Sequence, residues 1–232
     1  MSGSNSLHLS NPEKVYHALR KNRKVSKWLS FISNHYEPPR KKVLLIYPCA
    51  SVKPFTRSRS YRQLFKTLSA LSEKRNDVHL VTISEPFGLI PEEFYGKTEE
   101  LYDCPGLFRW FCLQHYERFD VEYLEKSIEI LAEHVAHFFT KASDRRRYSK
   151  IIAFVRTYSS GLRKRDDHTH RRIVELAARK SKVKVKILPK KRMVQNIVMK
   201  RGRYAWDRYG VGHPLAQEYL FKYLQDAIDR HD

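Results

Sequence analysis

The feature that most constrains the fold is a short apolar run, Val43–Tyr47, followed by a polar loop and a helical pattern. The run is rich in branched residues and short enough to be a buried strand. The helical pattern places Tyr61, Leu64, Phe65 and Leu68 on one face. A strand, a loop and a helix in this order place the loop at the carboxyl edge of a parallel sheet, where α/β folds bind ligands.

The loop after this strand carries closely spaced reactive and polar residues, namely Pro48-Cys49, Lys53-Pro54-Phe55, Ser58 and Tyr61. This pattern resembles the PC-x3-KPY-x2-S-x2-H signature of the archaeosine synthase core-domain family. A second block, SEPFGLIPEE at 84–93 and YDCP at 102–105, is similar to that family's PlGlVPrEl…YDiP segment. The detailed likeness covers residues 42–106, and no segment resembles the RNA-binding PUA domain of longer members.

The resemblance implies an enzyme that acts on tRNA carrying 7-cyano-7-deazaguanine in its D-loop. It implies that free lysine adds through its amine to the nitrile of this base, and that a radical SAM partner cleaves the adduct to the amidine. A partner chain bearing a PUA domain would help to capture the tRNA. Two positions depart from the family pattern. Phe55 lacks the hydroxyl of the usual Tyr, and Tyr61 replaces the final His, so another group activates the thiol or the reaction is slow.

Cys49 is the candidate nucleophile. A thiolate adds to a nitrile carbon to give a thioimidate that an amine can displace. Lys53 and the amino end of the following helix would lower the pKa of the thiol. Asp103 or Glu92 would protonate the developing nitrogen anion. Two alternatives stay open: Cys49 only lines the pocket while the lysine amine attacks directly, and Lys53 pairs with a carboxylate or with a phosphate.

The other motif residues are predicted to bind substrate. Ser58 and Ser60, with backbone N–H groups at the helix start, would hold a phosphate or the carboxylate of lysine. No metal or cofactor is expected, because the three cysteines include no CxxC pair. The predicted substrate-binding residues are Pro48, Ser51, Pro54, Phe55, Ser58, Ser60, Tyr61, Glu85, Gly88 and Glu92.

The net charge of +20 is concentrated in one segment. Residues 143–203 carry 21 lysines and arginines against 4 acidic residues, whereas residues 43–142 carry 12 against 14. Such clustering indicates a polyanion partner, here tRNA. The alternative is a surface adapted for solubility, salt or temperature. The predicted RNA-binding residues are Arg163, Lys164, Arg165, Lys184, Lys186, Lys190, Lys191, Arg192, Lys200, Arg201 and Arg203.

Further periodic stretches complete the predicted fold. We expect strands at 78–83, 151–155 and 183–187, with helices at 25–34 and 168–180, and further helices that begin at Pro12, from 120 onwards and after 214. A loop at 85–88 is expected to lead to a short helix that begins at Pro91. Together these elements predict a three-layer α/β sandwich with a mostly parallel sheet of about four strands flanked by helices. Residues 1–41 would form a basic helical arm that clamps RNA or packs on the core, and residues 42–232 the core domain.

The predicted compartment is the cytoplasm, without a membrane partner, because no apolar stretch approaches the roughly 18 residues of a membrane span and no signal peptide is present. Two rival functions remain. One is a non-catalytic tRNA-binding subunit that supports a transglycosylase or a radical SAM partner. The other is a glycosylase-like enzyme that acts on a flipped base. Loss of the family's Tyr and His favours the subunit, and retention of Cys49, Lys53 and Asp103 favours the enzyme.

Overall fold

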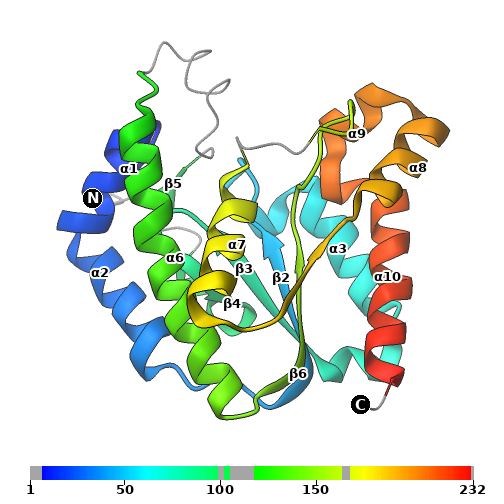
Figure 1. The fold of residues 1–232 in the computed structure, drawn as a ribbon, viewed down its shortest axis with the longest axis horizontal. Helices are drawn as coiled ribbons and strands as arrows, with labels where there is room; N and C mark the ends of the chain where they lie inside the picture. Colours follow the sequence, from blue (N-terminus) through cyan, green and yellow to red (C-terminus); the bar gives the residue numbers. More distant parts are fainter. Residues whose placement is uncertain (1–6, 99–101, 105–117, 164–167, 231–232) are drawn as a thin grey trace.

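The computed structural model describes residues 7–98, 102–104, 118–163 and 168–230, which form three layers with a β-sheet in the middle (Figure 1). The strands of this sheet are β2 (Lys41–Pro48), β3 (Val78–Ser84), β4 (Gly88–Pro91), β6 (Tyr148–Phe154) and β7 (Val185–Leu188). Their spatial order is β4-β3-β2-β6-β7, and only β4 runs antiparallel to its neighbour. The predicted mostly parallel sheet between helices is confirmed, with one strand more than expected.

Helices cover both faces of the sheet (Figure 1). One face carries α1 (Pro12–Lys21), α2 (Arg23–Ser30), α6 (Val121–Asp144) and α7 (Thr169–Ser181). The other carries α3 (Arg59–Ser69) and α10 (Pro214–Asp229), with α8 (Lys191–Arg201) and α9 (Arg203–Tyr209) next to them. The shorter elements are α4 (Tyr95–Thr98), a π-helical turn at Phe31–His35, and 3-10 turns at Phe55–Arg57, Ser72–Asp77, Glu92–Phe94 and Gly210–Gly212.

Strand β4 corrects the sequence prediction, which placed a loop and then a helix here. Gly88 adopts a φ of +66°, which lets the chain reverse directly after β3. The residues up to Pro91 then pair with β3 along the sheet edge. Proline is tolerated there because an edge strand does not need every backbone N–H for pairing. The helical turn follows one residue later, at Glu92–Phe94.

The two N-terminal helices pack on the core. Asn11 caps α1, its side chain accepting from the Lys14 backbone N–H at 2.9 Å, as the sequence indicates. The buried side chains of α1 and α2 belong to the same hydrophobic cluster as the sheet. Trp28 of α2 donates its indole N–H to the Phe87 carbonyl at 3.0 Å. The arm therefore packs against α6, while its lysines and arginines, such as Arg20, Lys24 and Lys27, are exposed. A separate two-stranded parallel ladder joins β1 (Leu7–His8) to β5 (Tyr102–Asp103).

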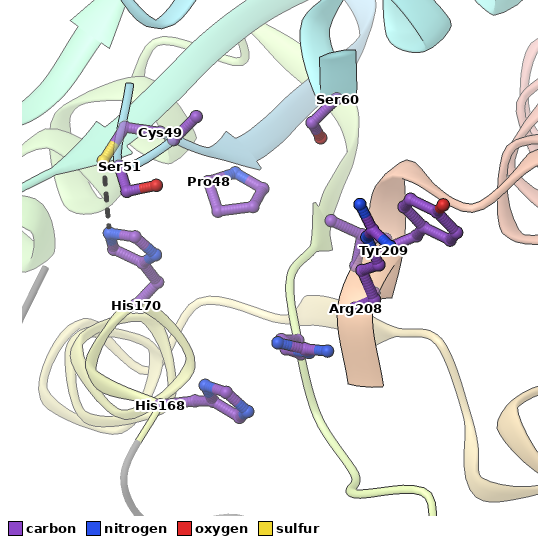
Figure 2. A pocket seen from close by; sticks show the side chains of 12 residues that line it. Pro48, Cys49, Ser51, Ser60, His168, His170, Arg208 and Tyr209 are labelled. Atoms are coloured by element: carbon purple, nitrogen blue, oxygen red, sulfur yellow. Dashed lines mark hydrogen bonds between the residues drawn. The ribbon is translucent and has the colours of Figure 1, made fainter. Parts of the chain in front are cut away.

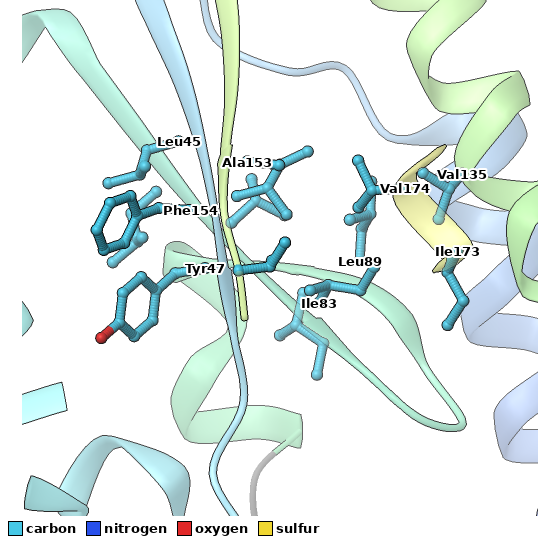
Figure 3. Packing of buried hydrophobic residues seen from close by; sticks show 14 of the residues in the cluster. Leu45, Tyr47, Ile83, Leu89, Val135, Ala153, Phe154, Ile173 and Val174 are labelled. Carbon is cyan, nitrogen blue, oxygen red and sulfur yellow. The ribbon is translucent and has the colours of Figure 1, made fainter. Parts of the chain in front are cut away.

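The core is built from both faces of the central strands (Figure 3). Residues 43–47 of β2 are all fully buried, as expected for a central parallel strand covered on both sides. On one face, the rings of Tyr47 and Phe154 stack at 6.4 Å between centroids, with an interplanar angle of 10°. On the other, Ile83 and Val174 pack among aliphatic side chains from α6 and α7 (Figure 3). This packing fixes the ends of the strands.

The parallel register brings three chain segments to one edge of the sheet. Pro48, the last residue of β2, lies opposite Ile83 in β3, so residues 49 and 85 leave the sheet as neighbours. Strand β6 pairs with the other side of β2, and the chain after it leads to the start of α7. Among the residues that the structure describes, no helix is long and apolar enough to cross a membrane.

Candidate active site

Cys49 and Glu85 follow directly from the carboxyl ends of β2 and β3. The backbone N–H of Cys49 donates to the carbonyl of Ile83 at 3.0 Å, which extends the ladder by one residue and fixes the base of the thiol side chain. The Glu85 side chain is 1% exposed, so its carboxylate requires a buried partner.

That partner is His170, in the first turn of α7 (Figure 2). Its Nε2 lies 2.9 Å from Oε2 of Glu85 and 3.7 Å from Sγ of Cys49. Thr169 donates its hydroxyl to the other carboxylate oxygen of Glu85 at 2.5 Å. The proton on Nε2 of His170 therefore lies between the thiol sulfur and a buried carboxylate.

Lys53 reaches the same sulfur from the loop after β2. Its Nζ lies 3.9 Å from Sγ of Cys49 and donates to the carbonyls of Ala50 at 2.5 Å and Cys104 at 2.9 Å. The ammonium also lies 5.1 Å from the ring centroid of Tyr102. These contacts hold a positive charge beside the thiol.

The charges of the cluster favour a thiolate–imidazolium pair. Burial opposes ionisation of the Cys49 thiol, but the nearby charges of Lys53 and His170 outweigh it, and the pKa of Cys49 is lowered. Burial also disfavours the charged imidazole, yet the Glu85 carboxylate and the thiolate raise the pKa of His170 to about 10. The same pairing with His170 overcomes burial and lowers the pKa of Glu85 to about 2. A thiolate of this kind is the reactive form of cysteine.

A cavity of about 200 Å³ opens next to the thiol (Figure 2). Residues 48–51 at the end of β2 and Ser60 in α3 line it. Residues 208–211, at the end of α9 and in the following turn, line it as well. Arg156, His168 and His170 complete the lining. The cavity is smaller than the roughly 300–1,000 Å³ of drug-sized ligand sites, so it suits one small ring system or an amino acid.

Of the predicted substrate-binding residues, Pro48, Ser51 and Ser60 line this cavity. Ser60 also exchanges a hydrogen bond of 2.8 Å with the Tyr47 hydroxyl. Glu85 lies in the catalytic cluster instead, as the partner of His170. Ser58 serves as the N-cap of α3, because its hydroxyl accepts from the Tyr61 backbone N–H at 3.2 Å.

Phe55 and Tyr61 lie in the hydrophobic core and are fully buried. Their ring centroids are 4.9 Å apart, and the Tyr61 hydroxyl is hydrogen-bonded to Thr82. Burial raises the pKa of Tyr61 well above its ordinary value, so this phenol stays neutral and cannot act as a base near neutral pH. The two departures from the family pattern thus fall on packed aromatic residues, and the imidazole near the thiol comes from α7. Pro54, half-buried, joins this loop to the Phe55–Arg57 turn.

Asp103, Glu92 and Gly88 lie outside the residues that line the cavity. The side chain of Asp103 is 51% exposed, and its Oδ2 lies 3.3 Å from Nδ1 of His8. Glu92 forms an ion pair with Arg75. Gly88 begins β4. For acid–base chemistry beside Cys49, the structure therefore offers His170 and Glu85 rather than the predicted Asp103 or Glu92.

The predicted RNA-binding residues that the structure describes are all exposed. Lys184 directly precedes β7, and Lys186 lies within it. Both alternate with the half-buried Val183, Val185 and Ile187, as the sequence pattern predicts. Lys164 and Arg165 lie outside the described residues. The remaining residues are Arg163 in the turn after β6, Lys190, Lys191, Arg192, Lys200 and Arg201 in and before α8, and Arg203 at the start of α9.

The sequence analysis did not predict the imidazole of His170 or the cavity lining formed by residues 208–211. A signal for the imidazole exists: the sequence His168-Thr169-His170 stands where a helix begins after the third parallel strand, and such helix starts lie at the edge that carries Cys49. No comparable signal marks Arg208 or Tyr209. They reach the cavity only because α9 folds back over α3, which sequence periodicity does not reveal.

The same cluster contains a set of metal-ligand atoms. Cys49, Glu85 and His170 each offer one such atom, and these atoms lie within 4.8 Å of one another. Thiolate, carboxylate and imidazole are all zinc ligands. However, Nε2 of His170 is already hydrogen-bonded to Glu85, and the Lys53 ammonium lies 3.9 Å from the sulfur, where it would repel a divalent cation. The arrangement fits proton transfer better than metal binding.

The fold and the site together define an α/β domain with a thiolate–imidazolium pair at the carboxyl edge of its sheet. The chain belongs to the family of a domain of unknown function, DUF5591, which matches residues 25–190. This match ends before α8, so residues 208–211 of the cavity wall lie beyond it.

Curated relatives agree with this family. The chain is 30% identical over 132 residues to archaeosine synthase subunit alpha of Thermoplasma acidophilum, covering 56% of this chain and 22% of that protein. It is 42% identical over 62 residues to the protein of the same name from Methanosarcina acetivorans, and this match covers 27% of this chain and 9% of that protein. It is 34% identical over 74 residues to the protein of the same name from Thermococcus kodakarensis, and this match covers 30% of this chain and 13% of that protein. The family indicated by the two sequence motifs is thereby confirmed.

The chain spans less than a quarter of the length of these relatives, with 22% as the largest share. Among solved structures, it is similar to the crystal structure of AF0587, a protein of unknown function. The TM-score is 0.46 and the sequence identity 16%, over 88% of this chain and 50% of that one.

Proposed function

We propose that this protein adds lysine to the nitrile of 7-cyano-7-deazaguanine in the D-loop of tRNA, as a cytoplasmic enzyme of archaeosine biosynthesis. The observation that carries the proposal is the thiol of Cys49, which lies 3.7 Å from His170 and 3.9 Å from Lys53 at the edge of a small cavity. The motif resemblance and the names of the curated relatives supply the substrate.

The first proposed step forms a covalent thioimidate. The Cys49 thiolate attacks the nitrile carbon, a C–S bond forms, and one π bond of the nitrile breaks with its electron pair moving to nitrogen. His170, charged at neutral pH because its pKa is raised to about 10, donates the proton that this nitrogen needs. Glu85 holds the imidazole in place through its contact of 2.9 Å with Nε2.

The second proposed step transfers the carbon to lysine. The neutral amine attacks the thioimidate carbon, the π pair of the C=N bond moves to its nitrogen, and the amine gives up a proton to the now neutral His170. The nitrogen pair then re-forms the C=N bond as the C–S bond breaks, and the electron pair of that bond returns to the Cys49 sulfur as thiolate. Lys53 stabilises that leaving thiolate from 3.9 Å. The product is a substituted amidine, and cysteine, histidine and carboxylate end in their starting protonation states.

Further partners follow from the same proposal. Cleavage of the lysine adduct to the free amidine requires a radical SAM enzyme. Capture of the tRNA would fall to the exposed basic residues of 184–203, or to a chain that carries a PUA domain. Capture by the basic residues is supported by the charge of residues 143–203, which contain 21 basic and 4 acidic residues.

The test is incubation of tRNA bearing the nitrile with isotopically labelled lysine, followed by mass analysis of the nucleosides. Wild type should transfer the label, and Cys49→Ala should transfer none. Asp103→Asn is the matched control, because this carboxylate is 51% exposed and lies outside the cavity lining. A stable mass adduct between Cys49 and the tRNA, seen without lysine, would identify the thioimidate. Undiminished transfer by Cys49→Ala would refute covalent catalysis. No transfer by a wild-type protein that binds this tRNA would indicate a binding subunit.

A further inference from the structure

Helix α9 carries an aromatic and cationic track from the protein surface to the cavity. Tyr204, in its first turn, is 72% exposed, while Arg208 and Tyr209 at its end line the cavity. Arg208 links the two rings. Its Nη1 donates to the Tyr204 hydroxyl at 2.9 Å, and its guanidinium lies 5.8 Å from the Tyr204 centroid and 5.5 Å from that of Tyr209. Arg59 of α3 lies over the Tyr209 ring at 4.2 Å.

The track is held by a rigid anchor. Trp206, between the two tyrosines, is fully buried and donates its indole N–H to the Tyr158 carbonyl at 2.9 Å. Arg156 donates to the Trp206 carbonyl at 2.8 Å. Gly210 packs so closely against Arg156 that a Cβ on it would lie 2.9 Å from the guanidinium Nε. The position of Tyr204 and Tyr209 relative to the cavity is therefore fixed by buried contacts.

The surroundings of the track are strongly basic. Residues 190–209 contain seven lysines and arginines and a single acidic residue, Asp207. An exposed aromatic ring among cations matches the way proteins bind single-stranded nucleic acid, where bases stack on aromatic rings and cations follow the phosphates. A membrane-binding helix would instead present a wide apolar face.

We propose that α9 binds an unpaired RNA strand next to the modified nucleotide. A neighbouring base stacks on Tyr204, Arg208 contacts the phosphate between the two nucleotides, and the target base passes Tyr209 into the Cys49 cavity. The inference rests on the proposed function only in taking RNA as the substrate. It explains how a base in a loop can reach a thiolate in a pocket, since a base must leave the stack before chemistry on it.

The test compares two RNAs of equal charge that carry the same terminal fluorophore and lack the nitrile. One is a hairpin with an unpaired loop, and the other is a fully paired duplex of the same number of phosphates. Binding is measured by fluorescence anisotropy at one fixed salt concentration, without lysine. Tyr204→Ala should weaken binding of the hairpin by roughly 5- to 150-fold and change duplex binding by less than about twofold. Tyr204→Phe should bind the hairpin as wild type does.

Two controls separate stacking from charge and from folding. Lys200→Ala should weaken both RNAs equally, because a phosphate contact does not distinguish them. Tyr123→Ala, in α6 on the opposite layer, should change neither. Equal loss on both RNAs with Tyr204→Ala, or no loss on the hairpin, would overturn the inference. Because no reaction takes place in this assay, failure of lysine transfer leaves its result unchanged, and the two proposals fail separately.

Discussion

The reactivity of Cys49 should depend on the positive charge of His170, which the Glu85 carboxylate helps to maintain. We consider His170→Ala and Glu85→Gln. A unit charge 3.7 Å from the sulfur contributes about 4 kcal/mol at an effective dielectric constant of about 20. When this charge is removed, water that enters the site and the charge of Lys53 still stabilise the thiolate, so the net loss of stabilisation is smaller. A net loss of about 1.5–3 kcal/mol corresponds to a roughly 10- to 100-fold smaller ratio of thiolate to thiol.

The assay is the rate of alkylation of Cys49 by iodoacetamide as a function of pH, followed on the Cys49 peptide by mass spectrometry. Wild type should react rapidly at pH 7, since the pKa of Cys49 is lowered. His170→Ala should react up to about 100-fold more slowly at pH 7 and approach the wild-type rate in alkaline solution.

Glu85→Gln should act in the same direction through the imidazole. Without the carboxylate, burial disfavours the charged form of His170, whose pKa is otherwise held at about 10. The exposed pair of His137 and Glu133, 3.4 Å apart in α6, supplies the controls His137→Ala and Glu133→Gln. Equal alkylation rates at pH 7 for wild type and His170→Ala would refute the thiolate–imidazolium pair.

Three further predictions concern stability and RNA binding. The folded pKa of Glu85, about 2 against an ordinary value of 4.5, gives stability that is present above about pH 4.5 and is lost as the pH falls towards 2. Urea unfolding at pH 5 and pH 3 should therefore reveal a larger loss for wild type than for Glu85→Gln; equal losses would contradict it. Gly88→Ala should lower the free energy of unfolding by about 1–3 kcal/mol, because φ is +66° there, whereas Gly96→Ala, with open space around it, should not destabilise the fold. In a salt titration of tRNA binding, Lys191→Ala and Lys200→Ala should each reduce the slope of log K against log salt concentration by up to about 0.7–0.9, and an unchanged slope would remove that lysine from the RNA interface.

Local spacing made part of the site predictable. Cys49 and Lys53 are four residues apart in one loop, and their contact of 3.9 Å needs no knowledge of the rest of the chain. Glu85 required one step more, the pairing of two parallel strands, and its position after β3 follows from that step. The strands and helices around these residues have strong periodicity, so their order and type followed from the sequence.

Contacts of long range could not be predicted in this way. His170 is 121 residues from Cys49 in sequence, and its role depends on how α7 returns to the sheet edge. Tyr61 occupies a position where the family has a histidine, and the sequence alone does not tell that its ring is packed in the core. Strand β4 was missed because a positive φ at Gly88 and a proline at its end do not form a strand pattern.

The family match ends at residue 190, so one part of the cavity lining lies within it and another part lies beyond it. The shared part carries Cys49, Lys53, Glu85 and His170, and with them the bond-making atoms. The part beyond the match, residues 208–211, lines the same cavity. Substitutions in residues 208–211 would therefore change which molecule fits the cavity without removing the Cys49 thiolate. Because Leu220 and Leu224 of α10 are fully buried in the hydrophobic core, a protein cut after residue 190 would lose the cover of one face of the sheet together with this part of the cavity lining.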